Sequence, residues 1–138
     1  MTMSLPINTI QSVSELALWV RDVDAAAAFY SETLGFTIRE IDSGRNAFLQ
    51  SGDFLLVLFN PESPGTELAD RYLARKGGPI GGGVYHVAFK VNPDQLDRYG
   101  ETVKAHGVDV MGPVNFGTGR RSYFFEDPDA HYIELTDR

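Results

Sequence analysis

Three side chains that suit a divalent metal ion lie on segments that read as strands: Glu15, His86 and Glu134. One imidazole and two carboxylates fit a hard or borderline ion such as Mn²⁺, Fe²⁺, Ni²⁺ or Zn²⁺. The two carboxylates would balance the charge of the ion and leave coordination positions for a substrate. From the residues alone a plainer interpretation stays open, because a Glu that begins a strand is usually solvated. A His in a strand is more often a hydrogen-bonded structural group than a ligand.

Residue alternation along the strands predicts that these three side chains share one concave space. Successive residues of a strand point to opposite faces of its sheet. Glu15, Trp19, His86, Tyr132 and Glu134 therefore point away from the helices, because the apolar faces that the helices must cover carry Leu16, Leu18, Val20, Val87, Phe89, Val91, Ile133 and Leu135.

The chain repeats its own pattern, and this sets the predicted fold. The segments 15–20 and 86–91 match in their apolar positions at an offset of 71 residues, and Gly35 and Gly107 each close a helical segment. Each half reads as strand, helix and three strands, so we expect an α+β domain over 1–138 with two βαβββ repeats, about 14–60 and 84–138, joined by a linker, 61–83. Pairing of the halves would give a curved mixed sheet, a cup with helices on its outside.

The predicted strands after the first helix are 36–41, 46–50 and 54–59, and after the second 108–111, 121–126 and 132–136; a further short helix is predicted over 66–76.

Composition limits the classes of function. The chain has 138 residues, a formal net charge of −7 and no cysteine. An acidic protein without a basic stripe is not expected to bind nucleic acid, and no apolar run is long enough to span a membrane. Without cysteine there is no disulfide, thiolate metal site or cysteine nucleophile. No secretory signal is recognisable at the N-terminus, so we expect a cytoplasmic protein.

Two motifs resemble those of the vicinal oxygen chelate superfamily. Phe29-Tyr30 followed by Leu34-Gly35-Phe36 is similar to one signature, and Asp127-Pro128-Asp129 followed by Ile133-Glu134-Leu135 is similar to another. The superfamily includes glyoxalase I, extradiol dioxygenases, fosfomycin-resistance enzymes, methylmalonyl-CoA epimerase and bleomycin-binding proteins. The resemblance covers the chain from about residue 14 to residue 138.

The resemblance implies four ligand positions, which fall on Glu15, Val57, His86 and Glu134. Val57 cannot bind a metal ion, which argues against glyoxalase I and the epimerase and leaves a three-ligand pattern. The implied activity is metal-dependent chemistry, dioxygenase-like or lyase- or transferase-like, on a small oxygenated substrate. Glu134 would then be both a ligand and a catalytic residue. A homodimer is expected, and in an exchanged dimer Glu15 would come from one chain while His86 and Glu134 come from the other; a side-by-side dimer is the alternative.

Further side chains near the cup are candidates for substrate binding and proton transfer. Arg120 or Arg121 would bind an anionic group, since guanidinium matches carboxylate and phosphonate geometry; an ordinary solvated turn pair is the alternative. Trp19 would line the pocket or pack its floor. Tyr123 or Tyr132 would donate a proton to a substrate oxygen, or serve as a structural phenol. We predict Tyr123 as catalytic, and Tyr132 as substrate-binding.

Two other function classes stay open at this point. A metal-free, bleomycin-resistance-like protein would hold an aromatic or cationic small molecule in the cup, which the acidic charge and Trp19 would allow. A protein that keeps only the fold would serve as an interaction domain. Metal content separates the first of these from the enzyme.

Overall fold

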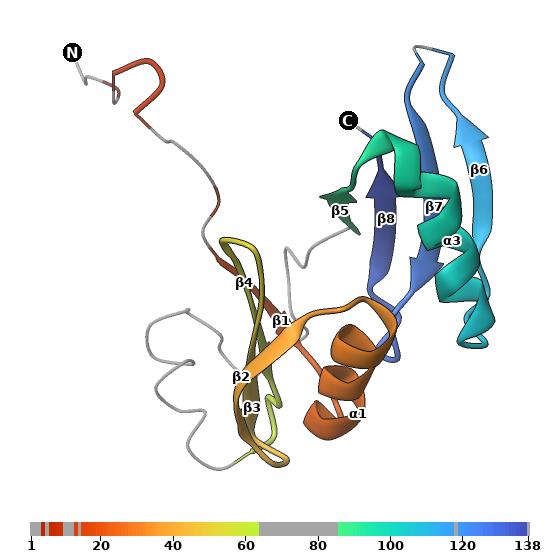
Figure 1. Cartoon of the computed structure of the whole chain (residues 1–138). Coiled ribbons are helices and arrows are strands. Elements are labelled where there is room, and N and C mark those ends of the chain that lie inside the picture. Colours follow the sequence, from red (N-terminus) through yellow and green to blue (C-terminus); the bar gives the residue numbers. More distant parts are fainter. Residues whose placement is uncertain are drawn as a thin grey trace.

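The computed structural model describes residues 4, 6–9, 13, 15–63, 86–117 and 119–137 (Figure 1). The helix predicted over 66–76 and most of the predicted linker lie outside these residues. The first half contains β1 (Glu15–Trp19), α1 (Val23–Ala28), the π-helical turn η1 (Phe29–Thr33), β2 (Thr37–Asp42), β3 (Asn46–Ser51) and β4 (Phe54–Phe59). The second half contains β5 (His86–Lys90), the 3₁₀ turn η2 (Pro93–Gln95), α3 (Leu96–Ala105), β6 (Met111–Asn115), β7 (Arg121–Glu126) and β8 (Tyr132–Thr136).

The strands form two four-stranded mixed sheets with the same topology. Their orders are β1-β4-β3-β2 and β5-β8-β7-β6. In each sheet the first strand pairs in parallel with the last strand of its half, and the other pairs are antiparallel. The helices lie outside the sheets (Figure 1). The predicted α+β fold of two βαβββ repeats is therefore confirmed.

Local sequence explains where the helical segments begin and end. The Asp22 side chain caps α1 by accepting a hydrogen bond from the backbone N–H of Ala25 at 3.0 Å. Gly35 and Gly107, which follow the helical segments, have φ of 76° and 82°. These values favour glycine, because a side chain is strained there. No helix in the described part of the chain is long and apolar enough to cross a membrane.

One strand differs from its prediction. The segment 108–111 was expected to be extended and paired, but β6 runs over Met111–Asn115, so the two ranges share only Met111. β6 contains Gly112 and Pro113, residues that are normally poor in strands. Proline is tolerated here because β6 is the edge strand of its sheet, where an N–H donor is not required on the outer side.

The two halves meet through α1 and the turn between β7 and β8, which lie side by side in Figure 1. The buried Tyr30 hydroxyl donates to Asp127 Oδ2 at 2.8 Å. The same oxygen lies 2.6 Å from His131 Nδ1, and Asp127 Oδ1 accepts from the backbone N–H groups of Asp129 and His131. We call Tyr30, Asp127 and His131 the interhalf cluster. Nearby, Arg21 bonds Asp129 with both its backbone N–H and its Nε.

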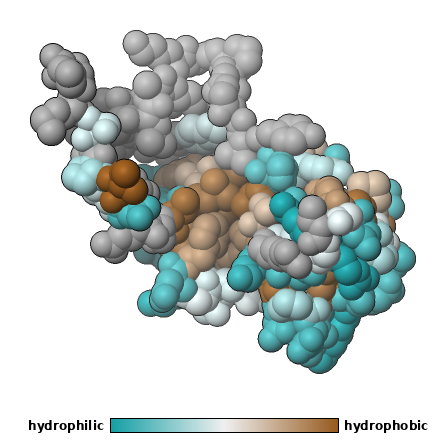
Figure 2. Space-filling view, turned by 90° about the horizontal axis from the view of Figure 1, so that it is seen from above, coloured by the Kyte–Doolittle hydropathy of each residue, from teal (hydrophilic) through white to brown (hydrophobic). Residues whose placement is uncertain are grey.

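An aromatic contact also joins the halves. Phe89 of β5 lies 5.7 Å from the ring centroid of Phe36 and 5.6 Å from that of Phe54, in edge-to-face geometry. A cavity of about 610 Å³ borders these rings, between η1, β4, β5 and α3. Figure 2 shows hydrophobic side chains gathered in the depression between the halves. Apolar burial and directed hydrogen bonds thus hold the two repeats together.

Candidate functional site

The face of the second sheet turned away from α3, here the distal face, carries most of the candidate site. The register places Glu134 opposite Phe124 on one side and Ala88 on the other. The side chains that share this face by alternation belong to His86, Ala88, Lys90, Ser122, Phe124, Glu126, Tyr132, Glu134 and Thr136. Residues of opposite parity, such as Ile133 and Leu135, pack into the core with α3. Alternation along β5, β7 and β8 thus sorts the site from the core.

His86 and Glu134, both predicted as ligands, lie together on the distal face. Nε2 of His86 is 3.3 Å from Oε1 of Glu134. The Glu134 side chain is only 3% exposed and that of His86 is 35% exposed. Nitrogen and oxygen donors that bind one Zn²⁺ at about 2.1 Å each lie roughly 3.0–3.4 Å apart, so this pair has a separation that suits two ligands of the same ion.

Arg120, Ser122 and Thr136 surround the Glu134 carboxylate. Arg120 Nη2 donates to Glu134 Oε2 at 2.5 Å, and the Ser122 hydroxyl donates to the same oxygen at 2.6 Å. Arg120 Nε donates to Thr136 Oγ1 at 3.1 Å. A carboxylate this buried is costly unless it is paired and hydrogen-bonded. Arg120 and Ser122 meet that requirement and fix the orientation of Glu134, while Thr136 holds Arg120 in place.

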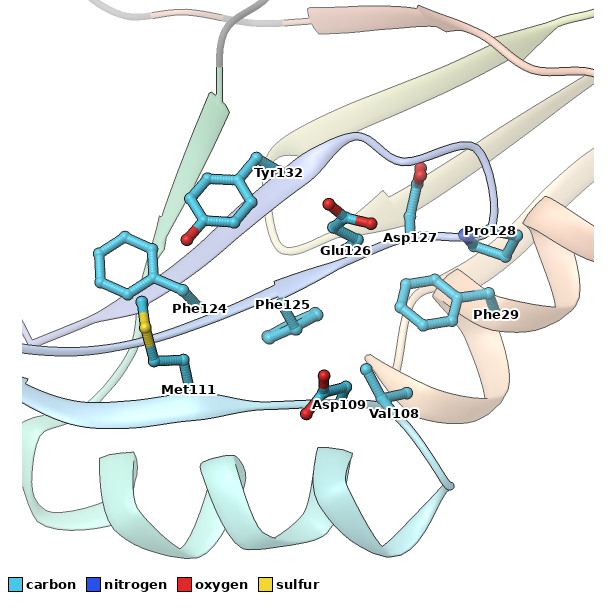
Figure 3. Close-up of a pocket in the computed structure, with 10 residues that line it drawn as sticks. All are labelled: Phe29, Val108, Asp109, Met111, Phe124, Phe125, Glu126, Asp127, Pro128 and Tyr132. Atoms are coloured by element: carbon cyan, nitrogen blue, oxygen red, sulfur yellow. The ribbon is translucent and has the colours of Figure 1, made fainter.

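Aromatic rings continue the distal face beside the ligand pair. Tyr132 and Phe124 stack with centroids 5.6 Å apart and an interplanar angle of 18°. Phe116 lies 6.2 Å from Phe124, and the Arg120 guanidinium lies 5.4 Å above the Phe116 ring. Figure 3 shows the Tyr132 and Phe124 rings next to each other on adjacent strands. They line one side of a pocket of about 550 Å³ that Phe29 of η1 also borders.

The first half presents a weaker version of the same arrangement. Ala17 pairs with Val57 in β1 and β4, as Ala88 pairs with Glu134 in β5 and β8, so Val57 is the structural counterpart of Glu134. Glu15, at the exposed start of β1, is the counterpart of His86. Val57 is fully buried and has no donor atom. One half therefore offers two ligands and the other offers one.

Glu15 does not join the other two predicted ligands within one chain. Among residues 15–63, 86–117 and 119–137, no three His, Asp or Glu side chains come close enough to hold one metal ion. Trp19, predicted on the same face of β1 as Glu15, packs against Phe59 of β4 with centroids 6.1 Å apart. Both residues thus belong to the first sheet and not to the neighbourhood of His86.

Arg121 and Tyr123 are placed differently from their prediction, and this is a correction. They lie on the face of β7 opposite Ser122. Arg121 forms two hydrogen bonds to Asp97 of α3, at 2.8 and 3.1 Å, and the Tyr123 hydroxyl donates to Asp97 Oδ1 at 2.7 Å. Burial, followed by the Asp97 contact, raises the pKa of Tyr123 to about 12. These two side chains anchor α3 to the sheet and do not face His86 and Glu134.

The sequence prediction missed Ser122 and Thr136, the two hydroxyls that support the site. Strand alternation could have identified both residues. Thr136 lies two residues after Glu134 on β8, and Ser122 pairs with Thr136 in β7, so all three side chains are on the same face. The predicted residues Arg120 and Tyr132, in contrast, do lie on or next to the distal face.

Comparisons with known proteins agree with this fold. Residues 12–135 match the family model described as "Glyoxalase/Bleomycin resistance protein/Dioxygenase superfamily". The metallothiol transferase FosB of Lysinibacillus sphaericus is 24% identical over 128 residues, covering 92% of this chain and 82% of that protein. The fosfomycin resistance protein FosX of Mesorhizobium japonicum is 29% identical over 139 residues, covering 91% of this chain and 85% of that protein.

Solved structures share the fold. A lactoylglutathione lyase from Agrobacterium tumefaciens superposes with a TM-score of 0.74 at 25% identity, covering 93% of this chain and 94% of that chain. A mutant of FosX from Listeria monocytogenes, complexed with Mn(II) and 1S,2S-dihydroxypropylphosphonic acid, superposes with a TM-score of 0.68 at 22% identity, covering 94% and 91%.

Proposed function

The chain belongs to the Glyoxalase/Bleomycin resistance protein/Dioxygenase superfamily, and from this premise we propose that it is a divalent-metal-dependent enzyme acting on a small oxygenated substrate. The observation that carries the proposal is the His86–Glu134 pair, with Nε2 and Oε1 3.3 Å apart on the distal face. A neutral imidazole and a carboxylate are ligands for Mn²⁺, Fe²⁺, Ni²⁺ and Zn²⁺. Support also comes from a structural relative, the FosX mutant, whose complex contains Mn(II) and a dihydroxypropylphosphonic acid.

Glu15 would complete the ligand set from a second copy of the chain, in an exchanged homodimer. Two features support this arrangement. Glu15 stands apart from His86 and Glu134 within the described residues of one chain. In addition, β1 and β5 are each at the edge of their own sheet, and they begin with Glu15 and His86. Edge strands of two copies placed next to each other would bring these residues to one site.

The residues on the distal face have separate tasks in this proposal. A bound divalent ion would supply Lewis acidity toward neighbouring substrate oxygens. Glu134 and His86 would hold the ion, Ser122 and Arg120 keep the Glu134 carboxylate in place, and the Tyr132–Phe124 stack would form an apolar wall beside the substrate. Because Tyr132 pairs with His86 in the register, its phenol is the nearest candidate to exchange a proton with the substrate.

Metal analysis tests the proposal. The purified protein is reconstituted separately with Mn²⁺, Fe²⁺, Ni²⁺ and Zn²⁺, desalted and analysed for bound metal. We expect one ion per candidate site, lost in Glu134→Ala and in His86→Ala but kept in Arg121→Gln, whose side chain faces α3. Retention of no ion by the wild-type protein would reject the metal-dependent enzyme.

That rejection would favour the second candidate, a metal-free protein that binds an aromatic or cationic small molecule. One observation supports it: Glu134 is already balanced by Arg120 and hydrogen-bonded by Ser122, so its burial does not require an ion. The Tyr132–Phe124 stack and the net charge of −7 suit such a ligand.

A further inference from the structure

The two oxygens of Glu134 have different surroundings. Oε2 accepts two hydrogen bonds, from Arg120 Nη2 at 2.5 Å and from the Ser122 hydroxyl at 2.6 Å. Oε1 faces Nε2 of His86 at 3.3 Å. A carboxylate oxygen has about two lone-pair sites, so Oε2 is fully used by the protein. Only Oε1 is turned toward the second ligand.

Arg120 is built into this part of the fold. Its Nε bonds Thr136 Oγ1, its Nη2 bonds Glu134, and its guanidinium lies 5.4 Å above the Phe116 ring. Three different contacts therefore fix one side chain, which is more than a solvated surface arginine normally has. The fork geometry of guanidinium allows the Thr136 and Glu134 contacts at the same time.

The Arg120 guanidinium, held at Oε2 of Glu134, disfavours binding of a divalent cation to the same carboxylate. Since unlike charges attract and like charges repel strongly where water is excluded, Arg120 both neutralises Glu134 and repels an ion beside it. Thr136, Ser122 and Glu134 are each 2% exposed or less, whereas the Arg120 side chain is 39% exposed, so water screens the repulsion from the Arg120 side but not from the sheet side.

We propose that Arg120 is the internal counter-ion of Glu134, which restricts Glu134 to one ligating oxygen, Oε1, and lowers the affinity of the site for a divalent ion. This inference rests on the proposed function. Its consequence is that Glu134 occupies one coordination position instead of two. One more coordination position of the ion is then left for substrate oxygens. Because Arg120 neutralises part of the Glu134 charge, less negative charge from the protein balances the ion.

The test compares two substitutions that remove the same charge from adjacent residues. Arg120→Gln removes the cation at Glu134, and the matched control Arg121→Gln removes a cation on the opposite face, paired with Asp97. Isothermal titration with Mn²⁺ and with Zn²⁺ should show binding to Arg120→Gln tighter than to wild type by about tenfold or more, because the repulsion between the guanidinium and the ion is removed. Arg121→Gln should match wild type.

Misfolding of Arg120→Gln would lower its affinity for Mn²⁺ and Zn²⁺, so a higher affinity cannot result from misfolding. Equal or weaker binding by Arg120→Gln than by Arg121→Gln would overturn the inference while leaving the proposed function intact. Absence of Mn²⁺ and Zn²⁺ binding by the wild type would reject both.

A crystal structure of the wild-type protein soaked with Mn²⁺ gives a second test that needs no variant. We expect the ion on Oε1, with Arg120 and Ser122 still bonded to Oε2. An ion that contacts both oxygens, or an Arg120 displaced from Oε2, would refute the assignment.

Discussion

Removal of the Tyr30 hydroxyl should destabilise the protein strongly, although it deletes a single atom far from the candidate site. In the interhalf cluster, Tyr30 is fully buried and donates to Asp127 Oδ2 at 2.8 Å across 97 residues of sequence. Tyr30→Phe keeps the ring and its packing against Phe29 and Phe36. The substitution therefore isolates one hydrogen bond to a buried carboxylate.

The expected loss in the free energy of unfolding depends on the hydrogen-bond partners that Asp127 keeps in Tyr30→Phe. Hydrogen bonds to charged groups contribute about 1.5–3 kcal/mol each. Asp127 keeps His131 Nδ1 and two backbone N–H donors, so its carboxylate is not left without partners. We therefore expect a loss of about 2 kcal/mol in the free energy of unfolding, equivalent to roughly 5–10 °C in Tm for a chain of this size.

Acid conditions should reduce the effect. Burial raises the pKa of Asp127, but hydrogen bonds from His131 and Tyr30 outweigh it, so the pKa of this carboxyl lies below its ordinary value of 3.8. Stability from a lowered carboxyl pKa is present above the ordinary value and is lost as the pH falls. Without the Tyr30 hydroxyl the pKa of Asp127 rises toward its ordinary value of 3.8. Tyr30→Phe should therefore lose less stability than the wild type as the pH falls through this range, and the difference in stability between the two proteins should narrow.

Urea unfolding at fixed protein concentration measures the loss, with two other tyrosines as controls. Tyr123→Phe removes a hydroxyl bonded to Asp97, whose side chain is 60% exposed, and should cost less. Tyr99 is 38% exposed, and Tyr99→Phe should be nearly neutral. A loss below about 0.5 kcal/mol for Tyr30→Phe, the level of ordinary surface changes, would refute the reasoning.

Three further outcomes are expected. The hydrogen bond to its buried carboxylate partner raises the pKa of His131 above the ordinary 6.5. Wild-type stability should therefore fall as the pH rises from about 6 to 9, and His131→Asn should flatten that profile in urea titrations at several pH values. Gly100→Ala, normally stabilising inside a helix, should instead cost about 1–3 kcal/mol, because the new Cβ would lie 2.7 Å from the Tyr123 ring; an unchanged or raised Tm would contradict this. Glu15→Ala and His86→Ala proteins should each bind Mn²⁺ weakly, but subunits unfolded and refolded together should regain tight binding in mixed dimers. Mixtures no better than their components, or a monomer by light scattering, would argue against the exchanged site.

The sequence pattern predicted the bounds of several strands well. The segments 54–59, 121–126 and 132–136 coincide with β4, β7 and β8. The prediction failed at β6, because Gly112 and Pro113 look unlike a strand. The edge of a sheet tolerates both residues. Whether a strand lies at an edge depends on the order of all strands in the sheet, which a short stretch of sequence does not reveal.

Parity also explains which site residues could be predicted. Alternation correctly placed Tyr132 and Glu134 on one face of β8. Arg121 and Tyr123 were grouped with Arg120 because they are close in sequence, yet the two point toward Asp97 on the helix side. The position of Glu15 relative to His86 depends on how the halves pack, which long-range contacts decide and local pattern does not reveal.

The separation of the strands into two sheets has a consequence for synthesis of the chain. Every hydrogen-bonded strand pair among the described residues joins strands of the same half, so each sheet can form from one continuous stretch. Docking of the two halves, through Phe36, Phe54 and Phe89 and through the interhalf cluster, is the step that needs both. The first sheet can therefore fold on the ribosome before the second is made, as local topology favours. Until Phe89 is synthesised, Phe36 and Phe54 lack their partner, and in that interval the nascent chain is most open to aggregation or to docking with another copy.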